Sequence, residues 1–173
     1  MPLWGGELEF SIDVMSVLSK AGCNAGTCHG NLNGKGGFRL SLRGQDPSFD
    51  YHSIVGSSRG RRISLSSPPQ SLILQKAVGE AGHRGGVRFN KDSDQYKVFL
   101  RWLHRGAKPP SDRAIKLKRL EVQPLDSVVV APQEHLKVNV IAHFSDGSTR
   151  DVTDRACYEL SNLNATEIGR AHV

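Results

Sequence analysis

The stretch AGCNAGTCHG, residues 21–30, carries the most specific chemistry in the chain. Two cysteines, Cys23 and Cys28, are followed at once by His29. This order is typical of covalent haem attachment, in which each thiol adds to one vinyl group of the porphyrin and the histidine binds the iron. Four residues separate the cysteines instead of the usual two, but they are small, and Gly26 can adopt a positive φ. The stretch therefore predicts one covalently bound haem c.

Two other interpretations of these cysteines stay open. A local disulfide would explain Cys23 and Cys28 but would leave the adjacent His29 to chance. A zinc site would need a fourth ligand from elsewhere, and the sequence has no second cluster of Cys and His residues. The third cysteine, Cys157, stands alone in a segment that alternates like a strand, so we expect a buried structural thiol there.

Length and composition set broad limits on the protein. The chain has 173 residues, 38% of them hydrophobic, which suits one or two small domains. It contains no apolar run long enough to cross a membrane, and no basic-then-apolar leader precedes the first predicted helix. Because bacteria attach haem covalently outside the cytoplasm, we expect an extracytoplasmic protein whose leader lies upstream of residue 1.

The net charge of +6 raises the question of an anionic partner. The basic residues are spread along the chain, and their densest cluster is Arg59, Arg61 and Arg62 around Gly60. A solvated surface explains such a cluster, and so does contact of Arg61 and Arg62 with haem propionates or an anionic partner. The pattern offers no platform for nucleic acid, so no nucleic-acid partner is expected.

Apolar spacing predicts three helices in the first part of the chain. They cover residues 11–20, residues 71–78 and a segment that begins after Ser93 and ends before Gly106. We expect Ser11 or Asp13 to cap the first of these helices and Gly22 to end it. Residues 46–62 are predicted to be loop, with one helical turn around residues 49–54.

The segment after His29 is too rich in glycine for a helix and is predicted to be a loop up to residue 37. Residues 38–42 then alternate between apolar and polar side chains, which predicts a short strand or extended piece. On its apolar face, Phe38 and Leu40 are candidates for the wall of a haem crevice, with ordinary core as the alternative.

Five segments together resemble a known family. They are DVMSVLSKAGCNAGTCHG (13–30), GGFRLSLRG (36–44), SLIL (71–74), HRGG (83–86) and WLHRGA (102–107). The resemblance is to the N-terminal cytochrome c-like domain of large planctomycete-type secreted proteins, and it covers about residues 8 to 165. In that family the domain is followed by a bacterial Ig-like domain and then by long domains of uncertain function. The resemblance implies that Cys23 and Cys28 hold the haem and that His29 is the proximal ligand.

The second iron ligand is less well defined. Small cytochromes commonly take it from the loop before the last helix, and His83 occupies that place here. Related domains have a Met-Pro-Pro loop near this position, so the chain departs from the family pattern. The competing ligands are His52, His104 and Met15, and an open or water-bound site is a further alternative. His83 could instead hydrogen-bond a propionate.

The second part of the chain predicts β structure. Residues 117–124, 127–130 and 136–144 are expected to form strands, and Asp146-Gly147 a hairpin turn. Short strands at this spacing are typical of a β-sandwich, and the sequence resembles the first half of a bacterial Ig-like domain. The last residues, IGRAHV (168–173), match one reading frame of a common sequencing-adapter oligonucleotide, which predicts a non-native tail.

These observations predict a multidomain chain with a small all-α cytochrome c-like domain at 8–113, a truncated all-β Ig-like sandwich at 117–167 and the tail at 168–173. The expected function is electron transfer by one haem, with His29 and His83 as iron ligands. The partner would be a redox protein or downstream domains of the same chain. Two alternatives are a haem-based sensor and a surface scaffold with structural cysteines, whose Ig-like part binds carbohydrate or protein. No residue pair suggests a hydrolytic catalytic site, so this fragment is not expected to be an enzyme.

Overall fold

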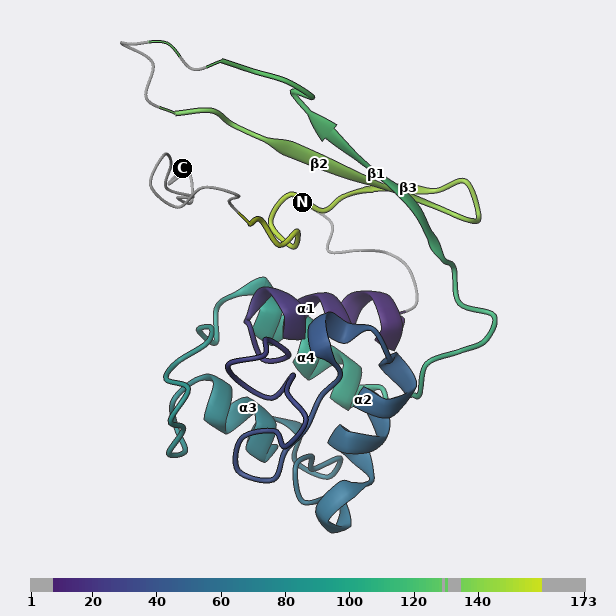
Figure 1. The fold of residues 1–173 in the computed structure, drawn as a ribbon. Helices are drawn as coiled ribbons and strands as arrows, with labels where there is room; N and C mark the ends of the chain where they lie inside the picture. Colours follow the sequence, from purple (N-terminus) through teal and green to yellow (C-terminus); the bar gives the residue numbers. More distant parts are fainter. Residues whose placement is uncertain (1–7, 129, 131–134, 160–173) are drawn as a thin grey trace. The chain divides into compact units, whose positions relative to one another are not determined.

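The computed structural model describes residues 8–128, 130 and 135–159. The chain divides into two compact units between Ala114 and Ile115. The described part of the first unit contains four α-helices: α1 (Met15–Lys20), α2 (Pro47–Val55), α3 (Leu72–Ala77) and α4 (Asp94–His104) (Figure 1). That of the second contains three strands: β1 (Leu117–Gln123), β2 (Asn139–Phe144) and β3 (Thr149–Asp151). The predicted tail at 168–173 lies outside the described residues.

The first predicted helix is confirmed, but its cap is different. A π-helical segment, Phe10–Val14, runs directly into α1. The Glu9 side chain accepts a hydrogen bond from the Ser11 amide at 3.4 Å, and the Asp13 carboxylate accepts one from the Glu9 amide at 2.9 Å. This reciprocal pair satisfies amides that the first helical turn leaves without a partner.

Side-chain caps begin α2 and α4. Ser93 Oγ accepts from the Tyr96 amide at 3.3 Å and begins α4, as predicted. α3 occupies the interior of the predicted helix 71–78. α2 is longer than the single turn predicted around residues 49–54, because Asp46 caps it through the Phe49 amide at 2.9 Å and Pro47 stands at its first position.

The core of the first unit brings α1 and α4 together. Three aromatic rings form a cluster in this core. The Trp102 ring centroid lies 5.2 Å from that of Phe10 and 5.3 Å from that of Phe99. The Trp102 indole donates to the Lys108 carbonyl at 2.9 Å, and the Tyr51 hydroxyl donates to the Ala107 carbonyl at 3.0 Å. Trp102 and Tyr51 thus have polar partners as well as apolar ones.

Residues 38–42, predicted to be a short strand or an extended piece, form no strand. Phe38 makes only an isolated bridge with Lys35, and a 3-10 helix begins at Leu42. The buried Asp50 carboxylate accepts from the Ser41 amide at 2.5 Å and from the Ser41 hydroxyl at 2.7 Å. The Asp50 side chain from α2 therefore accepts the Ser41 amide hydrogen bond that a neighbouring strand would otherwise accept.

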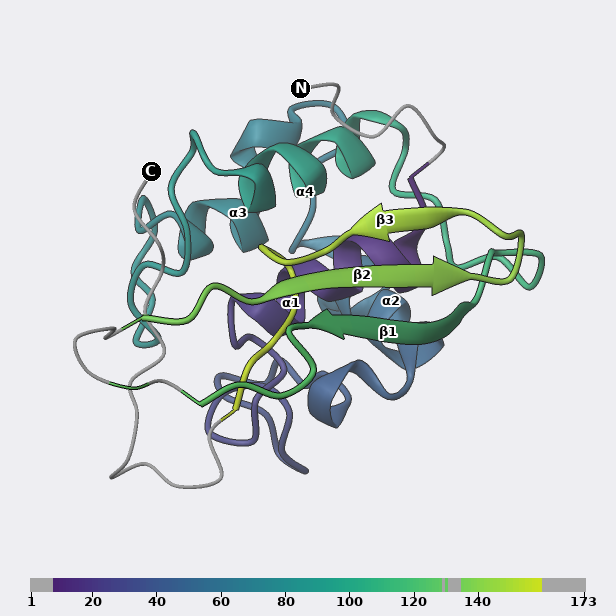
Figure 2. The same ribbon diagram turned by 90° about the horizontal axis from the view of Figure 1, so that it is seen from above.

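The second unit is a small antiparallel sheet in the order β1-β2-β3, with β2 in the middle (Figure 2). Opposite residues in β1 and β2 include Leu120 with Ala142 and Glu121 with Ile141. The predicted hairpin turn joins β2 to β3, with Gly147 at φ 83° and Asp146 accepting from the Ser148 amide at 2.9 Å.

The predicted fold class is wrong. The described residues form a mixed chain of four short helices and one three-stranded sheet, not an all-α domain followed by an Ig-like sandwich. A sandwich needs two packed sheets, and residues 127–128, 130 and 136–138, which were expected to lie in strands, are not in strands. Long loops also occupy much of the first unit, including residues 21–41. Within the described residues, no helix has the length and apolar character needed to cross a membrane.

Candidate functional site

The end of α1 determines where Cys23 lies. The Gly22 amide bonds to the Ser19 carbonyl at 2.9 Å, and the Cys23 amide bonds to the Leu18 carbonyl at 2.8 Å. With Gly22 at φ 70°, this is a Schellman turn. The residue after the turn commonly packs back on the helix, and Cys23 does so by packing against the hydrophobic core. The predicted end of the helix at Gly22 is thus confirmed.

The four-residue spacer between the cysteines is a folded loop. The Cys28 amide bonds to the Ala25 carbonyl at 2.9 Å, and the His29 amide bonds to the Cys23 carbonyl at 3.0 Å. The Asn31 side chain donates to the Gly26 and Cys28 carbonyls at 3.0 and 3.1 Å. These bonds hold both cysteines and His29 in one compact loop after α1.

The close packing of this loop requires glycine at position 30. A Cβ atom there would lie 1.9 Å from the Asn24 carbonyl oxygen, a distance that no side chain tolerates. Any other residue at position 30 would require the loop to rearrange.

Cys23 and Cys28 are free, half-buried thiols in the structure. Burial raises the pKa of Cys23 to about 11, although the positive charge of Arg88 acts in the opposite direction. Among the described residues, no group of three or more His, Cys, Asp and Glu side chains could hold a metal ion, so the zinc alternative has no ligand set there.

The His29 imidazole is held from one side by the segment that follows it. Its Nδ1 lies 2.9 Å from the Phe38 carbonyl oxygen, which can only accept, so Nδ1 carries the proton. The Phe38 ring packs 4.6 Å from the His29 ring. Burial lowers the pKa of His29, more than the backbone carbonyls of Phe38 and Lys35 raise it. His29 is thus kept neutral with Nε2 as its basic nitrogen.

The structure brings His83 to His29 from a distant part of the chain. Their ring centroids are 6.3 Å apart, and their planes differ by 10°. His83 Nδ1 donates to the Gly86 carbonyl at 2.9 Å, so its Nε2 is also the basic nitrogen. The loop folds tightly around the ring, since a Cβ at Gly85 would lie 2.7 Å from the imidazole.

The separation of the two rings is one that a pair of histidines could have if both held one metal ion. Two imidazoles that bind one metal ion from opposite sides, each at about 2 Å, have ring centres roughly 6 Å apart. A backbone carbonyl on Nδ1 is the usual arrangement for a histidine that binds metal through Nε2. Cys23 and Cys28 on the adjoining loop are the two thiols that covalent attachment of a haem would use.

The remaining predicted site residues have other surroundings. Leu40 is only 1% exposed and belongs to the hydrophobic core. Arg61 is exposed, whereas Arg62 is buried and donates to the Ser53 and Gly37 carbonyls at 3.0 and 3.3 Å. The Arg62 guanidinium also lies 4.6 Å from the Phe38 ring centre. Arg62 thus supports the side chain that packs on His29.

The alternative ligands lie elsewhere. His52 is exposed on α2 with its Nδ1 bonded to the Ser48 carbonyl at 2.7 Å, and His104 is exposed at the end of α4. Met15 is buried in the core. Cys157, predicted to be buried in a strand, is exposed and lies in no strand, because β3 ends at Asp151. That prediction is wrong.

Sequence reasoning missed Arg88. Its Nε donates to the Ala21 carbonyl at 2.7 Å, and one terminal nitrogen donates to the Gly85 carbonyl at 3.0 Å. Because both acceptors are backbone atoms, no partner side chain in the sequence could have indicated these contacts.

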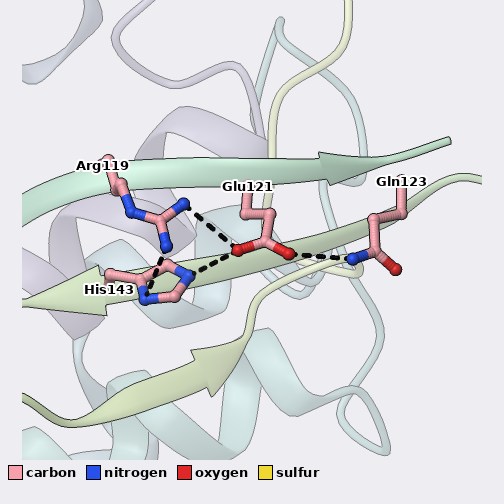
Figure 3. A network of polar contacts seen from close by, with 4 residues as sticks. All are labelled: Arg119, Glu121, Gln123 and His143. Carbon is pink, nitrogen blue, oxygen red and sulfur yellow. Dashed lines mark hydrogen bonds and ion pairs between the residues drawn. The ribbon is translucent and has the colours of Figure 1, made fainter. Parts of the chain in front are cut away.

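The second unit carries a separate polar network (Figure 3). Glu121 accepts from Arg119 at 3.1 Å and from Gln123 at 2.8 Å, and its carboxylate lies 3.0 Å from His143 Nε2. These hydrogen bonds lower the pKa of Glu121, and the one with His143 has the largest effect. The group links β1 to β2 on an exposed face of the sheet, where solvent screens such contacts and makes their contribution to stability small.

Comparison of the chain with known protein families, curated proteins and solved structures finds no match.

Proposed function

We propose that residues 8–113 form a monohaem c-type cytochrome domain that transfers electrons. One observation carries this proposal. His83 lies beside His29, across 54 positions of sequence, with the rings 6.3 Å apart, and His29 adjoins the two free thiols Cys23 and Cys28. A structural cysteine pair alone would give no reason for two imidazoles to converge in this way.

Each residue of the site has a definite role in this proposal. Cys23 and Cys28 attach the porphyrin, His29 is the proximal ligand and His83 is the distal ligand. The haem supplies one-electron redox chemistry when bound. Two imidazole ligands favour a lower reduction potential than one imidazole and one methionine would.

The surroundings of His29 support its role as a ligand. Burial lowers its pKa, so the imidazole is neutral at neutral pH and has a lone pair on Nε2. The Phe38 carbonyl fixes the tautomer and the ring orientation. Arg62, by packing on the Phe38 ring, holds that wall of the site in place.

The proposal extends to compartment and partner. Covalent haem attachment places the protein outside the cytoplasm, in the periplasm or at the cell surface. Electrons would pass to or from a separate redox protein or further domains of the same polypeptide.

The test is co-expression with a periplasmic haem-ligation system, followed by intact mass and a pyridine haemochrome spectrum. We expect the mass of one added haem, lost when Cys23→Ser and Cys28→Ser are combined. His83→Ala should convert low-spin iron to high-spin iron, while the matched variants His52→Ala and His104→Ala should not. A folded wild-type chain of unmodified mass would refute the proposal. Covalent haem that is high-spin and readily binds CO in the wild type would favour a sensor instead.

A further inference from the structure

Arg88 connects three segments that meet at the candidate site. Its guanidinium donates to the Ala21 carbonyl at 2.7 Å and to the Gly85 carbonyl at 3.0 Å. Its own amide donates to the Ala77 carbonyl at 2.7 Å. Ala21 and Ala77 lie at the ends of α1 and α3, and Gly85 lies in the loop that carries His83.

The contact with the end of α1 is close. A Cβ atom at Gly22 would come within 2.7 Å of an Arg88 terminal nitrogen, so the guanidinium lies directly against the Schellman turn. The last carbonyls of a helix carry partial negative charge and bind cations favourably. The planar fork of arginine can reach two carbonyls at once, which the single ammonium group of lysine does less well.

Among the described residues, the hydrogen bonds made within the His83 loop do not by themselves connect it to the loop that carries Cys23, Cys28 and His29. The Gly86 amide bonds to the His83 carbonyl at 2.9 Å, and His83 Nδ1 bonds to the Gly86 carbonyl, so both contacts are internal. Lys76 reaches the Gly82 carbonyl at 2.6 Å and anchors the beginning of the loop to α3. Arg88 supplies the corresponding contact toward α1.

We propose that Arg88 is a positioning residue that holds the His83 loop against the end of α1 and thereby keeps His83 opposite His29. The role of Arg88 in placing an iron ligand rests on the proposed function. The anchoring itself concerns the polypeptide alone and can be measured without the cofactor.

Amide hydrogen exchange of the segment 82–89, measured by mass spectrometry on haem-free full-length chain, tests the anchoring. We expect Arg88→Gln to increase exchange in this segment about tenfold, the factor that corresponds to about 1.4 kcal/mol. Arg88→Lys, which keeps the charge but not the fork, should increase exchange by an intermediate factor. The matched control is Arg84→Gln, which removes a neighbouring positive charge and should leave the exchange unchanged.

The same variants are then loaded with haem. We expect Arg88→Gln to attach haem with the wild-type yield by mass but to show a larger high-spin fraction than either the wild type or Arg84→Gln. Unchanged exchange and unchanged spin state in Arg88→Gln would overturn the positioning role, and so would an Arg88→Lys variant indistinguishable from wild type. A wild-type chain that attaches no haem would refute the proposed function alone, because faster exchange in the haem-free Arg88→Gln variant still supports the anchoring.

Discussion

At the scale of single residues, the Phe38 carbonyl determines what the His29 imidazole can do. It accepts a hydrogen bond from Nδ1–H at 2.9 Å, and the Phe38 ring centroid lies 4.6 Å from that of the imidazole. Burial then disfavours the imidazolium form. The same side chain is thereby oriented, kept neutral and left with one basic nitrogen.

This environment predicts a pH dependence of stability in the haem-free chain. Because the folded pKa of His29 lies below the unfolded value of 6.5, the unfolded chain binds the extra proton as the pH falls through 6.5. Stability should therefore decrease on acidification from about pH 6.5 and stop decreasing, for this group, below its folded pKa. The measurement is the urea midpoint at several pH values.

The control for this prediction is His29→Gln, which should show a shallower decrease over the same pH range. Asp50, whose pKa is raised by burial, changes stability in the opposite direction, but it is present in both proteins and so does not affect their difference. An equal slope in wild type and variant would contradict the assignment to His29.

The thiols predict an order of chemical reactivity. Cys23 has a pKa of about 11 in the folded chain against 9.0 without burial, so its thiolate fraction at pH 8 falls by about a hundredfold. We expect iodoacetamide to modify the exposed Cys157 first and to modify Cys23 about a hundredfold more slowly in the folded chain than in urea. Peptide mass mapping over time measures this, and fast labelling of Cys23 in the folded chain would contradict the described burial.

At the scale of secondary-structure elements, the turn that ends α1 supports the Cys-His loop. Gly22 adopts φ 70°, where a residue with a Cβ is strained by about 1 kcal/mol. Its Cβ would also come within 2.7 Å of an Arg88 nitrogen. The turn therefore depends on glycine for its backbone conformation and for the contact with Arg88.

Gly22→Ala should destabilise the chain by about 1–2 kcal/mol, as measured by urea unfolding. Gly36→Ala is the matched control, since Gly36 has a similar φ of 62° and a Cβ atom there would meet nothing within 4 Å. We expect the control to cost less, because only the backbone strain remains. A cost for Gly22→Ala no greater than that for Gly36→Ala would indicate that the Arg88 contact contributes nothing.

The elements that sequence could predict are those with local signals. The Ser93 hydroxyl marks the start of a helix, Gly22 marks a helix end because it adopts a positive φ without strain, and Asp146-Gly147 favours a hairpin turn. α2 was predicted as one turn because its apolar spacing is weak, although Asp46 and Pro47 were usable start signals. The missing strand at 38–42 depends on Asp50, whose contact with Ser41 no local pattern reveals.

The candidate site was predictable to a similar degree. Cys23, Cys28 and His29 stand together in the sequence, whereas His83 required an argument from its place before the last helix. The convergence of His83 on His29 and the contacts of Arg88 arise from tertiary packing across more than fifty positions. The sandwich was predicted from strand spacing and from a resemblance to an Ig-like domain, and strand spacing does not determine how many sheets form.

At the scale of the whole molecule, the division into two units predicts where the chain is cut. Residues 109–116 contain no helix or strand, and residues 111–113 are exposed. We expect limited trypsin digestion of the haem-loaded chain to cleave after Arg113 early and to leave the haem on the N-terminal fragment. Intact mass of the fragments measures this, and Arg113→Gln should delay the cut. Early cleavage within α1 to α4, or a haem found on the C-terminal fragment, would contradict the division.

The Schellman turn at Gly22 also bears on the order in which the protein matures. In this turn, Cys23 packs back onto the hydrophobic core. A thiol enclosed in this way is a slow nucleophile. Maturation of the proposed cytochrome is therefore expected to begin on a chain whose first helix has not yet closed, so that cofactor attachment and folding compete in time. A polypeptide that folds early would be a poor substrate for the machinery that completes it.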